Sequence, residues 1–341
     1  MKETIRCAVL GLGRLGYWHA ENLAHKVKGA ELAAVADPMD GKAEQVAREL
    51  GVEKFSQNPD EIFEDPEIDA VAIITPTNTH ADMIKKAAAH KKHIFTEKPI
   101  TETVQQAEEV VEAVQKNNVF CQVGFMRRFD PAYVEAKKRM DAGEIGKPLY
   151  FKGVTRDGAT PPPEFIKNSG GLYLDFSIHD YDAARFLLDA DVNTVTAHGS
   201  VLQHTYVKEF GDVDQALTYL TFDTGAAADI EASRNVQYGY DIRAEVVGTH
   251  GAIQVGSLKN NNVQVLTSKG STHDIVPDFP ALYSEAYLQE MVSFINCLRK
   301  GEKPLVDEMD GKAALEIAAA ATKSYQENKT IRLCEESSVN A

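Results

Sequence analysis

Cysteine is scarce in this chain of 341 residues, which has only Cys7, Cys121, Cys297 and Cys334, and no two of them are closely spaced. Disulfide-rich secreted domains need many cysteines, and structural zinc sites need closely spaced pairs. Two of the four, Cys7 and Cys121, lie in apolar runs that predict core strands. The sequence therefore predicts reduced thiols in a cytoplasmic protein, with neither a disulfide framework nor a zinc site.

Long hydrophobic runs are also missing. No stretch approaches the roughly 20 apolar residues that a membrane-spanning helix needs, and the N-terminus does not have the pattern of a secretory signal. We therefore expect no membrane partner.

Positive charge is in short supply as well. The chain has 36 Lys and Arg against 51 Asp and Glu, and its net charge is −15. Such a balance disfavours nucleic acid or an anionic membrane surface as the main partner. A polyanionic substrate would be repelled on approach, so a neutral small molecule fits better.

A glycine-rich turn near the N-terminus is the strongest feature that is present. An apolar run over residues 4–10 leads into Gly11, Gly13 and Gly16, and a helical pattern follows over residues 14–25. Glycines at this spacing allow the tight turn, the approach of a diphosphate to the backbone, and close packing of the helix on the strand. The N–H groups at the start of that helix then bind the diphosphate.

A second strand pattern over residues 30–36 ends in Asp37, at the expected distance of about 20 residues from the glycines. Such a carboxylate accepts hydrogen bonds from a ribose 2′-OH and repels the 2′-phosphate of NADP. Arg14 is a counter-argument, because it could partly neutralise that phosphate, but no Arg or Lys follows Asp37 until Lys42. The sequence therefore favours NAD over NADP as the cofactor.

The rest of the first half alternates strand and helix patterns, which predicts an α/β fold with a doubly wound parallel Rossmann sheet over residues 1–123. Ligands of such sheets bind outside the carboxyl ends of the strands. Five segments fall at those ends and should surround one crevice: Gly11, Asp37, Thr75, Glu97–Lys98 and Gly124.

The second half, residues 124–341, has many sequential strand patterns and two long helical patterns, at residues 284–300 and 307–326. This arrangement predicts a second α/β domain with a large open, mostly antiparallel sheet. Helices can cover only one face of such a sheet, so we expect the other face to associate with further copies of the chain.

Asp175, His179 and Asp182 form the strongest chemical cluster outside the glycine turn. They follow Gly170–Gly171, and a helix starting near Asp175 would place all three on one face. An imidazole flanked by carboxylates is suited to take a proton from a hydroxyl. The spacing alone is equally compatible with a helix-terminal acid and a structural histidine.

Lys98 is the second candidate, because it follows a core strand and precedes a proline that restricts its backbone. A fixed ammonium there could favour an alkoxide, although a surface lysine in a loop is the alternative. Arg127 and Arg128 could bind substrate or simply pair with acids. Asp157 and Tyr238 lie in loops that could reach a polyol or merely pack.

Taken together, Gly11-Leu-Gly-Arg-Leu-Gly16, Glu97-Lys98-Pro99, the segment from Gly124 to Asp130, and Asp175-x-x-x-His179 resemble the glucose–fructose oxidoreductase, inositol dehydrogenase and rhizopine-catabolism (Gfo/Idh/MocA) family. The resemblance covers nearly the whole chain and is greatest for bacterial NAD-dependent inositol 2-dehydrogenases. Details such as Phe-Asp-Pro-Ala-Tyr133 are more similar to the scyllo-inositol branch than to the myo-inositol branch.

The resemblance implies a homotetramer built on the open sheets and a cyclitol substrate, whose ring hydroxyl is oxidised to the ketone while hydride goes to NAD. His179 would take the hydroxyl proton, Asp175 would orient it, and Lys98 would stabilise the alkoxide, so no metal is expected. A cis bond between Lys98 and Pro99 is also implied. Gly158 after Asp157 departs from the family pattern and leaves the choice of inositol isomer open.

The residues expected in the site fall into two sets. The expected cofactor-binding residues are Gly11, Leu12, Gly13, Arg14, Leu15, Gly16, Asp37, Thr75, Pro76, Asn78, His80, Glu97, Lys98 and Met126. The expected substrate-binding residues are Lys98, Arg127, Asp157, Asp175, His179 and Tyr238.

Three alternative functions remain open at this point. The chain could be an NAD-dependent dehydrogenase of an aldose or another cyclic polyol. It could also be a regulator that senses NAD without turnover, although Lys98 with Asp175 and His179 argues against that. A family-related glycosidase that uses NAD transiently would release sugar with no net NADH.

Overall fold

The chain folds into two compact units, each made of two separate stretches of sequence. Unit 1 comprises Met1–Phe129 and Glu285–Leu315, and unit 2 comprises Asp130–Ser284 and Glu316–Ala341. The computed structural model describes residues 2–158 and 161–333, so Cys334 lies outside the described residues.

Unit 1 contains a six-stranded parallel sheet in the order β3-β2-β1-β4-β5-β6. This is the strand order of a Rossmann sheet, so the fold predicted for the first half is confirmed. The strands are β1 (Ile5–Leu10), β2 (Ala30–Ala36), β3 (Lys54–Ser56), β4 (Ala70–Ile73), β5 (His93–Glu97) and β6 (Cys121–Gly124).

Helices connect these strands and pack against the sheet. They are α1 (Arg14–His25), α2 (Lys42–Leu50), α3 (Pro59–Glu64), α4 (His80–Ala89) and α5 (Val104–Asn117), with short 3-10 turns η1 (Thr77–Thr79) and η2 (Met126–Phe129). The start of α5 is fixed by a capping box between Thr103 and Gln106, which satisfies two backbone N–H groups that the helix itself leaves open.

Helix α10 (Phe279–Lys300) contributes to the core of unit 1 although it lies far along the sequence. Its side chains Met291, Phe294, Ile295 and Leu298 join one buried cluster with residues of β1, α1 and α2. This packing is why residues 285–315 group with unit 1 and not with the chain that precedes them. The expected boundary at residues 123/124 follows sequence order and does not separate this segment.

Unit 2 contains a seven-stranded sheet in the order β12-β11-β7-β10-β9-β8-β15. Only β7 and β10 pair in parallel, and every other neighbouring pair is antiparallel, so the predicted open, mostly antiparallel sheet is confirmed. Its strands are β7 (Pro148–Arg156), β8 (Val192–Ser200), β9 (Gln215–Phe222), β10 (Ala227–Ser233), β11 (Asp241–Gly248), β12 (Ala252–Val255) and β15 (Ile331–Arg332).

One face of this sheet is buried and the other is exposed. Along β9, Ala216, Thr218 and Leu220 are buried, whereas the alternate residues Leu217 and Tyr219 are each 44% exposed.

The described helices of unit 2 are α6 (Pro131–Asp141), α7 (Pro163–Ser169), α8 (Leu172–Asp175), α9 (Ile178–Leu188) and α11 (Glu308–Glu327), with the 3-10 turn η3 (Thr205–Phe210). The division between the units falls inside α11, as it does inside α10.

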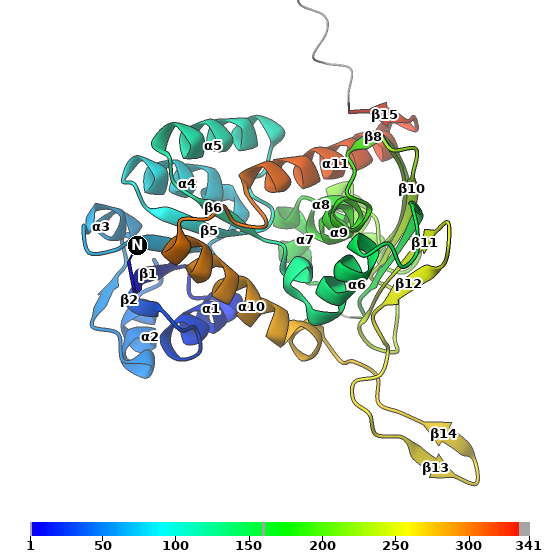
Figure 1. Ribbon diagram of the computed structural model, residues 1–341, viewed down its shortest axis with the longest axis horizontal. Coiled ribbons are helices and arrows are strands. Elements are labelled where there is room, and N and C mark those ends of the chain that lie inside the picture. Colours follow the sequence, from blue (N-terminus) through cyan, green and yellow to red (C-terminus); the bar gives the residue numbers. More distant parts are fainter. Residues whose placement is uncertain (1, 159–160, 334–341) are drawn as a thin grey trace, which may run out of the picture. The chain divides into compact units, whose positions relative to one another are not determined.

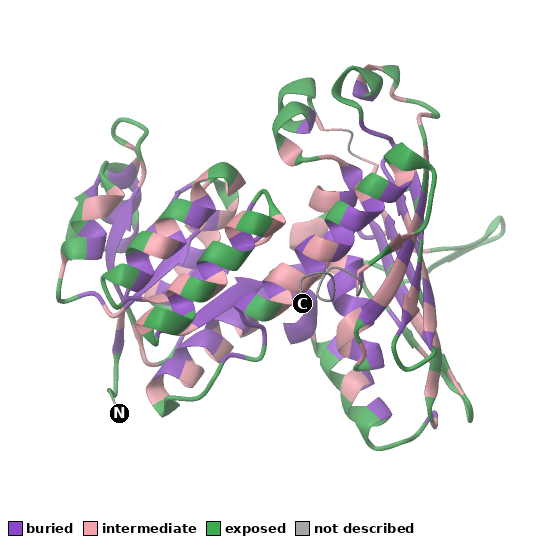
Figure 2. Ribbon diagram, turned by 90° about the horizontal axis from the view of Figure 1, so that it is seen from above, coloured by how far each residue is buried: buried purple, intermediate pink, exposed green. Residues whose placement is uncertain are grey.

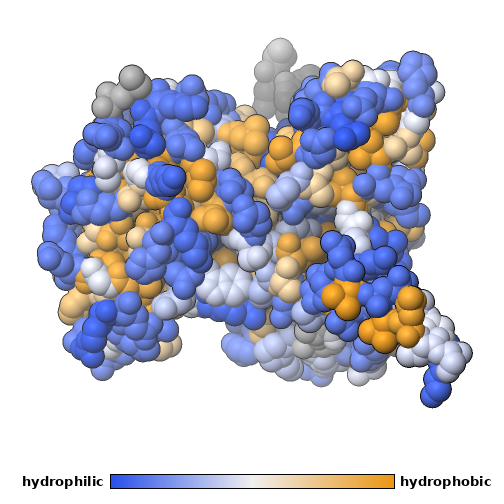
Figure 3. Space-filling view, turned by 60° about the horizontal axis from the view of Figure 1, so that its bottom comes forward, coloured by the Kyte–Doolittle hydropathy of each residue, from blue (hydrophilic) through white to orange (hydrophobic). Residues whose placement is uncertain are grey.

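A hairpin of β13 (Val265–Thr267) and β14 (Gly270–Thr272) extends from unit 2, and its strand residues are exposed (Figure 1). Colouring by burial shows that the sheet strands of both units are largely buried (Figure 2). The face drawn in Figure 3 is mostly hydrophilic, with separate hydrophobic areas. None of the helices in the described part of the chain has the length and hydropathy that crossing a bilayer requires.

Candidate active site

The glycine turn between β1 and α1 has the geometry that its sequence predicts. Gly11 has a φ of +86°, and a side chain there would also press on the Ile74 carbonyl. A Cβ at Gly16 would overlap the carbonyl oxygen of Gly11, whereas the space beside Gly13 is open. Gly13 is the N-cap of α1 and supplies no side-chain cap. The start of α1 thus has the arrangement in which the backbone N–H groups of a helix bind an anionic ligand.

Asp37 lies directly after β2 and holds the glycine turn from the side. Its Oδ2 accepts a hydrogen bond from the backbone N–H of Leu12 at 2.7 Å, and its Oδ1 accepts one from Met39 at 2.9 Å. The carboxylate thus has a fixed orientation at the carboxyl end of β2. This is the position at which a Rossmann domain binds the ribose of a dinucleotide.

Two cavities adjoin Asp37 at this edge of the sheet. One has a volume of about 680 Å³, and the expected cofactor-binding residues among those that line it are Gly11, Gly13, Asp37, Thr75, Pro76 and Asn78. The other has a volume of about 450 Å³, and its lining includes Leu12, Gly13, Arg14, Asp37 and Lys42. Leu15 and Gly16 lie in α1 and line neither cavity.

His80 connects the ends of two strands instead of lining these cavities. The histidine is buried, and its ring nitrogens lie 2.9 Å from the carbonyl oxygens of Pro99 and Thr75. It therefore ties the turn after β4 to the turn after β5. Lys98 lies in the second of these turns, and its peptide bond to Pro99 is cis, as the resemblance implied.

The turn η2 follows β6 and carries the expected site residues Met126 and Arg127 and the further candidate Arg128 in buried positions. Met126, Arg127 and Arg128 are 3%, 2% and 6% exposed. Arg128 forms an ion pair with Asp310 at 3.0 Å. Of the two roles considered for this arginine, binding substrate or pairing with an acid, it has the second. Arg127 is the more deeply buried of the two arginines.

Asp175 and His179 lie on two short helices, because a turn at Phe176–Ser177 separates α8 from α9. The expectation of one helix starting near Asp175 is therefore wrong, since the chain turns between the two residues. The preceding Gly170 and Gly171 have φ values of +77° and +89°. This conformation explains the glycine pair, because other residues rarely adopt it.

Arg234 is a residue of this site that sequence reasoning missed. Its guanidinium is 2% exposed and donates to Asp175 at 3.0 Å and to Asp212 at 3.4 Å. Asp212 in turn accepts the N–H of Leu172 at the start of α8. The arginine therefore fixes both ends of α8. No local motif in the sequence identifies this arginine.

Asp157 follows β7, and its N–H donates to the Ser233 carbonyl at 2.9 Å. A Cβ on the next residue, Gly158, would overlap the carbonyl oxygen of Val236. The departure from the family pattern at Gly158 therefore has a local steric reason in this chain.

Tyr238 is half-exposed and belongs to a polar network on the sheet. Its hydroxyl donates to Asp241 at 2.7 Å and accepts from Arg156 at 3.1 Å. Arg156 also binds both carboxylate oxygens of Glu231, at 2.9 and 2.6 Å. Burial raises the pKa of Tyr238 above its usual value, so the phenol is protonated at neutral pH and remains a donor.

Within unit 1 the structure brings Gly11, Gly13, Asp37, Thr75 and Asn78 together around one cavity. Within unit 2 it connects Asp175 to Arg234 and places His179 one short turn further along the chain. Lys98 belongs to unit 1, whereas Asp175, His179, Asp157 and Tyr238 belong to unit 2.

Comparison with known proteins relates both halves of the chain to one family. Residues 5–125 match the oxidoreductase family with an NAD-binding Rossmann fold, and residues 137–333 match the C-terminal α/β domain of the same family.

Three relatives match almost the full length. The chain is 55% identical over 333 residues to scyllo-inositol 2-dehydrogenase (NAD(+)) of Bacillus subtilis, a match that covers 98% of this chain and 97% of that protein. It is 38% identical to myo-inositol 2-dehydrogenase of Thermotoga maritima, over 96% and 98% of the two chains. The crystal structure of scyllo-inositol dehydrogenase from Lactobacillus casei with bound NAD(H) and scyllo-inositol has a TM-score of 0.90 at 31% identity, over 96% and 99% of the two chains. The chain thus belongs to the Gfo/Idh/MocA family of NAD-binding oxidoreductases.

Proposed function

We propose that this chain is an NAD-dependent inositol 2-dehydrogenase, which oxidises a ring hydroxyl of scyllo-inositol or myo-inositol to the inosose. The observation that carries the proposal is the 55% identity to scyllo-inositol 2-dehydrogenase (NAD(+)) along 98% of this chain. That relative favours scyllo-inositol as the better substrate of the two.

The cofactor site of unit 1 fits NAD. The uncapped start of α1 suits the diphosphate, and Asp37 suits a ribose with a free 2′-OH. When bound, the nicotinamide supplies the hydride acceptor. The carboxylate of Asp37 disfavours NADP, although Arg14 and Lys42 border the same cavity.

In the proposed mechanism, His179 takes the proton of the reacting hydroxyl. Asp175, held by Arg234, orients the imidazole. Lys98 donates to the substrate oxygen and stabilises the negative charge that develops on it. Asp157, Tyr238 and Arg127 are proposed to help to position the other hydroxyls of the ring.

We also propose that the chain forms a homotetramer in the cytoplasm. The exposed face of the seven-stranded sheet supports self-association, because Leu217 and Tyr219 are each 44% exposed on it. Cys7 and Cys121 are buried free thiols in the described structure, which suits a reducing compartment.

The test is NADH formation by the purified chain with myo-inositol, scyllo-inositol, chiro-inositol and glucose, each with NAD and NADP in parallel. We expect NADH formation with scyllo-inositol and NAD at the highest kcat/KM. Turnover of glucose alone would make the chain an aldose dehydrogenase instead. Tight NADH binding without turnover of any polyol would indicate a sensor, and release of sugar from a glycoside without net NADH would indicate a glycosidase.

A further inference from the structure

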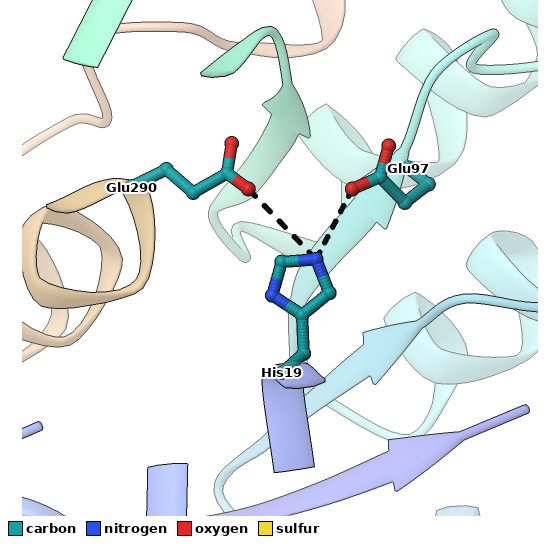
Figure 4. A group of neighbouring side chains, drawn as sticks. All are labelled: His19, Glu97 and Glu290. Carbon is teal, nitrogen blue, oxygen red and sulfur yellow. Dashed lines mark hydrogen bonds and ion pairs between the residues drawn. The ribbon is translucent and has the colours of Figure 1, made fainter. Parts of the chain in front are cut away.

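A buried cluster of three ionisable side chains lies inside unit 1. His19 comes from α1, Glu97 is the last residue of β5, and Glu290 comes from α10 (Figure 4). The Nε2 atom of His19 lies 3.1 Å from Oε1 of Glu97 and 3.8 Å from Oε1 of Glu290. His19 and Glu290 are fully buried, and Glu97 is 8% exposed. No step of the proposed mechanism uses these groups.

Aromatic rings pack against His19 and help to exclude water from the cluster. The ring of Phe95 lies 5.2 Å from that of His19, and the ring of Tyr287 lies 5.9 Å from it, edge-on. Two carboxylates in such an environment cannot both stay charged beside a neutral imidazole without a large desolvation cost. One proton must therefore be held within the cluster.

The hydrogen bonds indicate which carboxylate is charged. Glu97 faces two donors, the ring nitrogen of His19 and the backbone N–H of Lys98 at 3.2 Å. Neither carboxyl oxygen of Glu290 has a hydrogen-bond partner among the described residues. Burial, and then the charge of Glu97, raise the pKa of Glu290 well above its usual value. The negative charge thus lies on Glu97, and Glu290 is a neutral acid.

The carboxylate of Glu97 is also confined by its neighbour on the sheet. Gly124 pairs with Glu97 across β5 and β6, and a Cβ there would come within 3.0 Å of the carboxyl carbon. Glu97 was expected among the cofactor-binding residues, but this packing turns its carboxylate toward His19. Its second oxygen holds the peptide N–H of Lys98, so the cluster fixes the start of the turn that carries the lysine.

A metal ion is the main alternative, because the three ligand atoms lie within 4.8 Å of one another. A histidine that binds a metal almost always donates its other ring N–H to an acceptor. Nδ1 of His19 has no such acceptor in the described part of the chain. These three side chains therefore fit a proton held on Glu290 better than a metal ion.

We propose that His19, Glu97 and Glu290 are positioning residues for Lys98, with Glu290 holding a proton while Glu97 carries the charge. The cluster connects α1, the helix of the cofactor site, to the end of β5, which Lys98 directly follows. The inference rests on the proposed function, in which Lys98 stabilises the alkoxide.

The first experiment compares kcat and KM of the full-length enzyme and its variants with scyllo-inositol and NAD. Glu97→Gln removes the charge and should lower kcat about tenfold to a hundredfold, as expected when a catalytic group is misplaced, with little change in KM for NAD. Glu290→Ala should also lower kcat, and Glu290→Gln should restore most of it, because glutamine mimics a neutral acid. Glu285→Gln, an exposed change on the same helix, is the matched control.

Gly124→Ala serves as a second variant if Glu97→Gln fails to fold, because the added Cβ displaces the carboxylate without removing it. Wild-type kcat in folded Glu97→Gln or Gly124→Ala overturns the positioning role. A loss in Glu290→Gln as large as that in Glu97→Gln, together with one metal ion per chain in the purified wild type, would establish the metal site instead.

A second measurement does not depend on turnover. The infrared difference spectrum between wild type and Glu290→Gln at pH 7 should show the stretch of a protonated carboxyl group in the wild type. Its absence overturns the charge assignment. If that band is present but no inositol is oxidised by the wild type, the proposed function fails, and with it the role of the cluster in positioning Lys98, while the assignment of the proton holds.

Discussion

The imidazole of His179 is the side chain whose loss should affect chemistry most selectively. General-base catalysis typically contributes about 10²–10⁴ in rate, so His179→Ala should lower kcat by that factor. The affinity for NADH, measured by fluorescence titration, should stay near that of the wild type. Wild-type turnover in this variant would remove His179 from the mechanism.

Asp37 combines two effects, because it repels a 2′-phosphate and also holds the glycine turn. Asp37→Asn removes the charge, but its amide oxygen can still accept one backbone N–H. We expect the preference of kcat/KM for NAD over NADP to fall about tenfold, or about 1.4 kcal/mol. The melting temperature is the control, and an unchanged preference would show that the carboxylate does not contact the ribose.

Arg234 bridges two carboxylates that no lysine could bridge with the same geometry, because only the guanidinium offers several donors in a fixed plane. Arg234→Lys should therefore keep the charge but lower kcat, since Asp175 loses its fixed orientation. Arg234→Ala leaves the buried Asp212 without its arginine partner and should cost about 3–5 kcal/mol of unfolding free energy. Urea denaturation measures the loss of unfolding free energy in Arg234→Ala. An unchanged kcat in Arg234→Lys would contradict the role of the arginine in orienting Asp175.

Single residues were predictable where a local pattern defines them. Gly11, Gly13, Gly16 and Asp37 follow the spacing that the backbone requires. The partners of Asp175 and Glu97 were not predictable, because Arg234 and His19 meet them through tertiary contacts between distant segments.

At the level of elements, the junction of β1 and α1 allows a matched pair of glycine substitutions. Gly16→Ala places a methyl group on the Gly11 carbonyl and should destabilise the fold of unit 1. Gly13→Ala meets open space, so it should keep the melting temperature yet weaken NAD binding, because the methyl group lies where the diphosphate approaches. Thermal melting measures the effect of each variant on stability, and NADH titration measures its effect on cofactor binding. Equal melting temperatures for Gly16→Ala and Gly13→Ala would contradict the expected overlap with the Gly11 carbonyl.

The alternation of strands and helices predicted the parallel sheet, because apolar runs bounded by turns define buried strands. The break between α8 and α9 was not predictable, because neither of the two residues at the break, Phe176 and Ser177, is a glycine or a proline.

For the whole molecule, the exposed face of the seven-stranded sheet governs assembly in the proposed tetramer. Leu217→Lys together with Tyr219→Lys adds two charges to that face, so the oligomer should dissociate at micromolar concentration in sedimentation velocity. Leu202→Lys, at an exposed loop position, is the control. A tetramer that persists in the double variant would place the interface elsewhere.

The route of the chain through the two units was the least predictable feature. The apolar face of α10 is evident from its sequence, but nothing local indicates that Met291 and Phe294 pack in the core of unit 1.

That route has a consequence for synthesis on the ribosome. The first 129 residues leave the exit tunnel long before Phe294, Ile295 and Leu298 are translated, so the part of the unit 1 core that these side chains complete stays uncovered until then. We expect fragments that end before residue 285 to be aggregation-prone clients of chaperones, and folding of this domain to be completed only when most of the protein has been made.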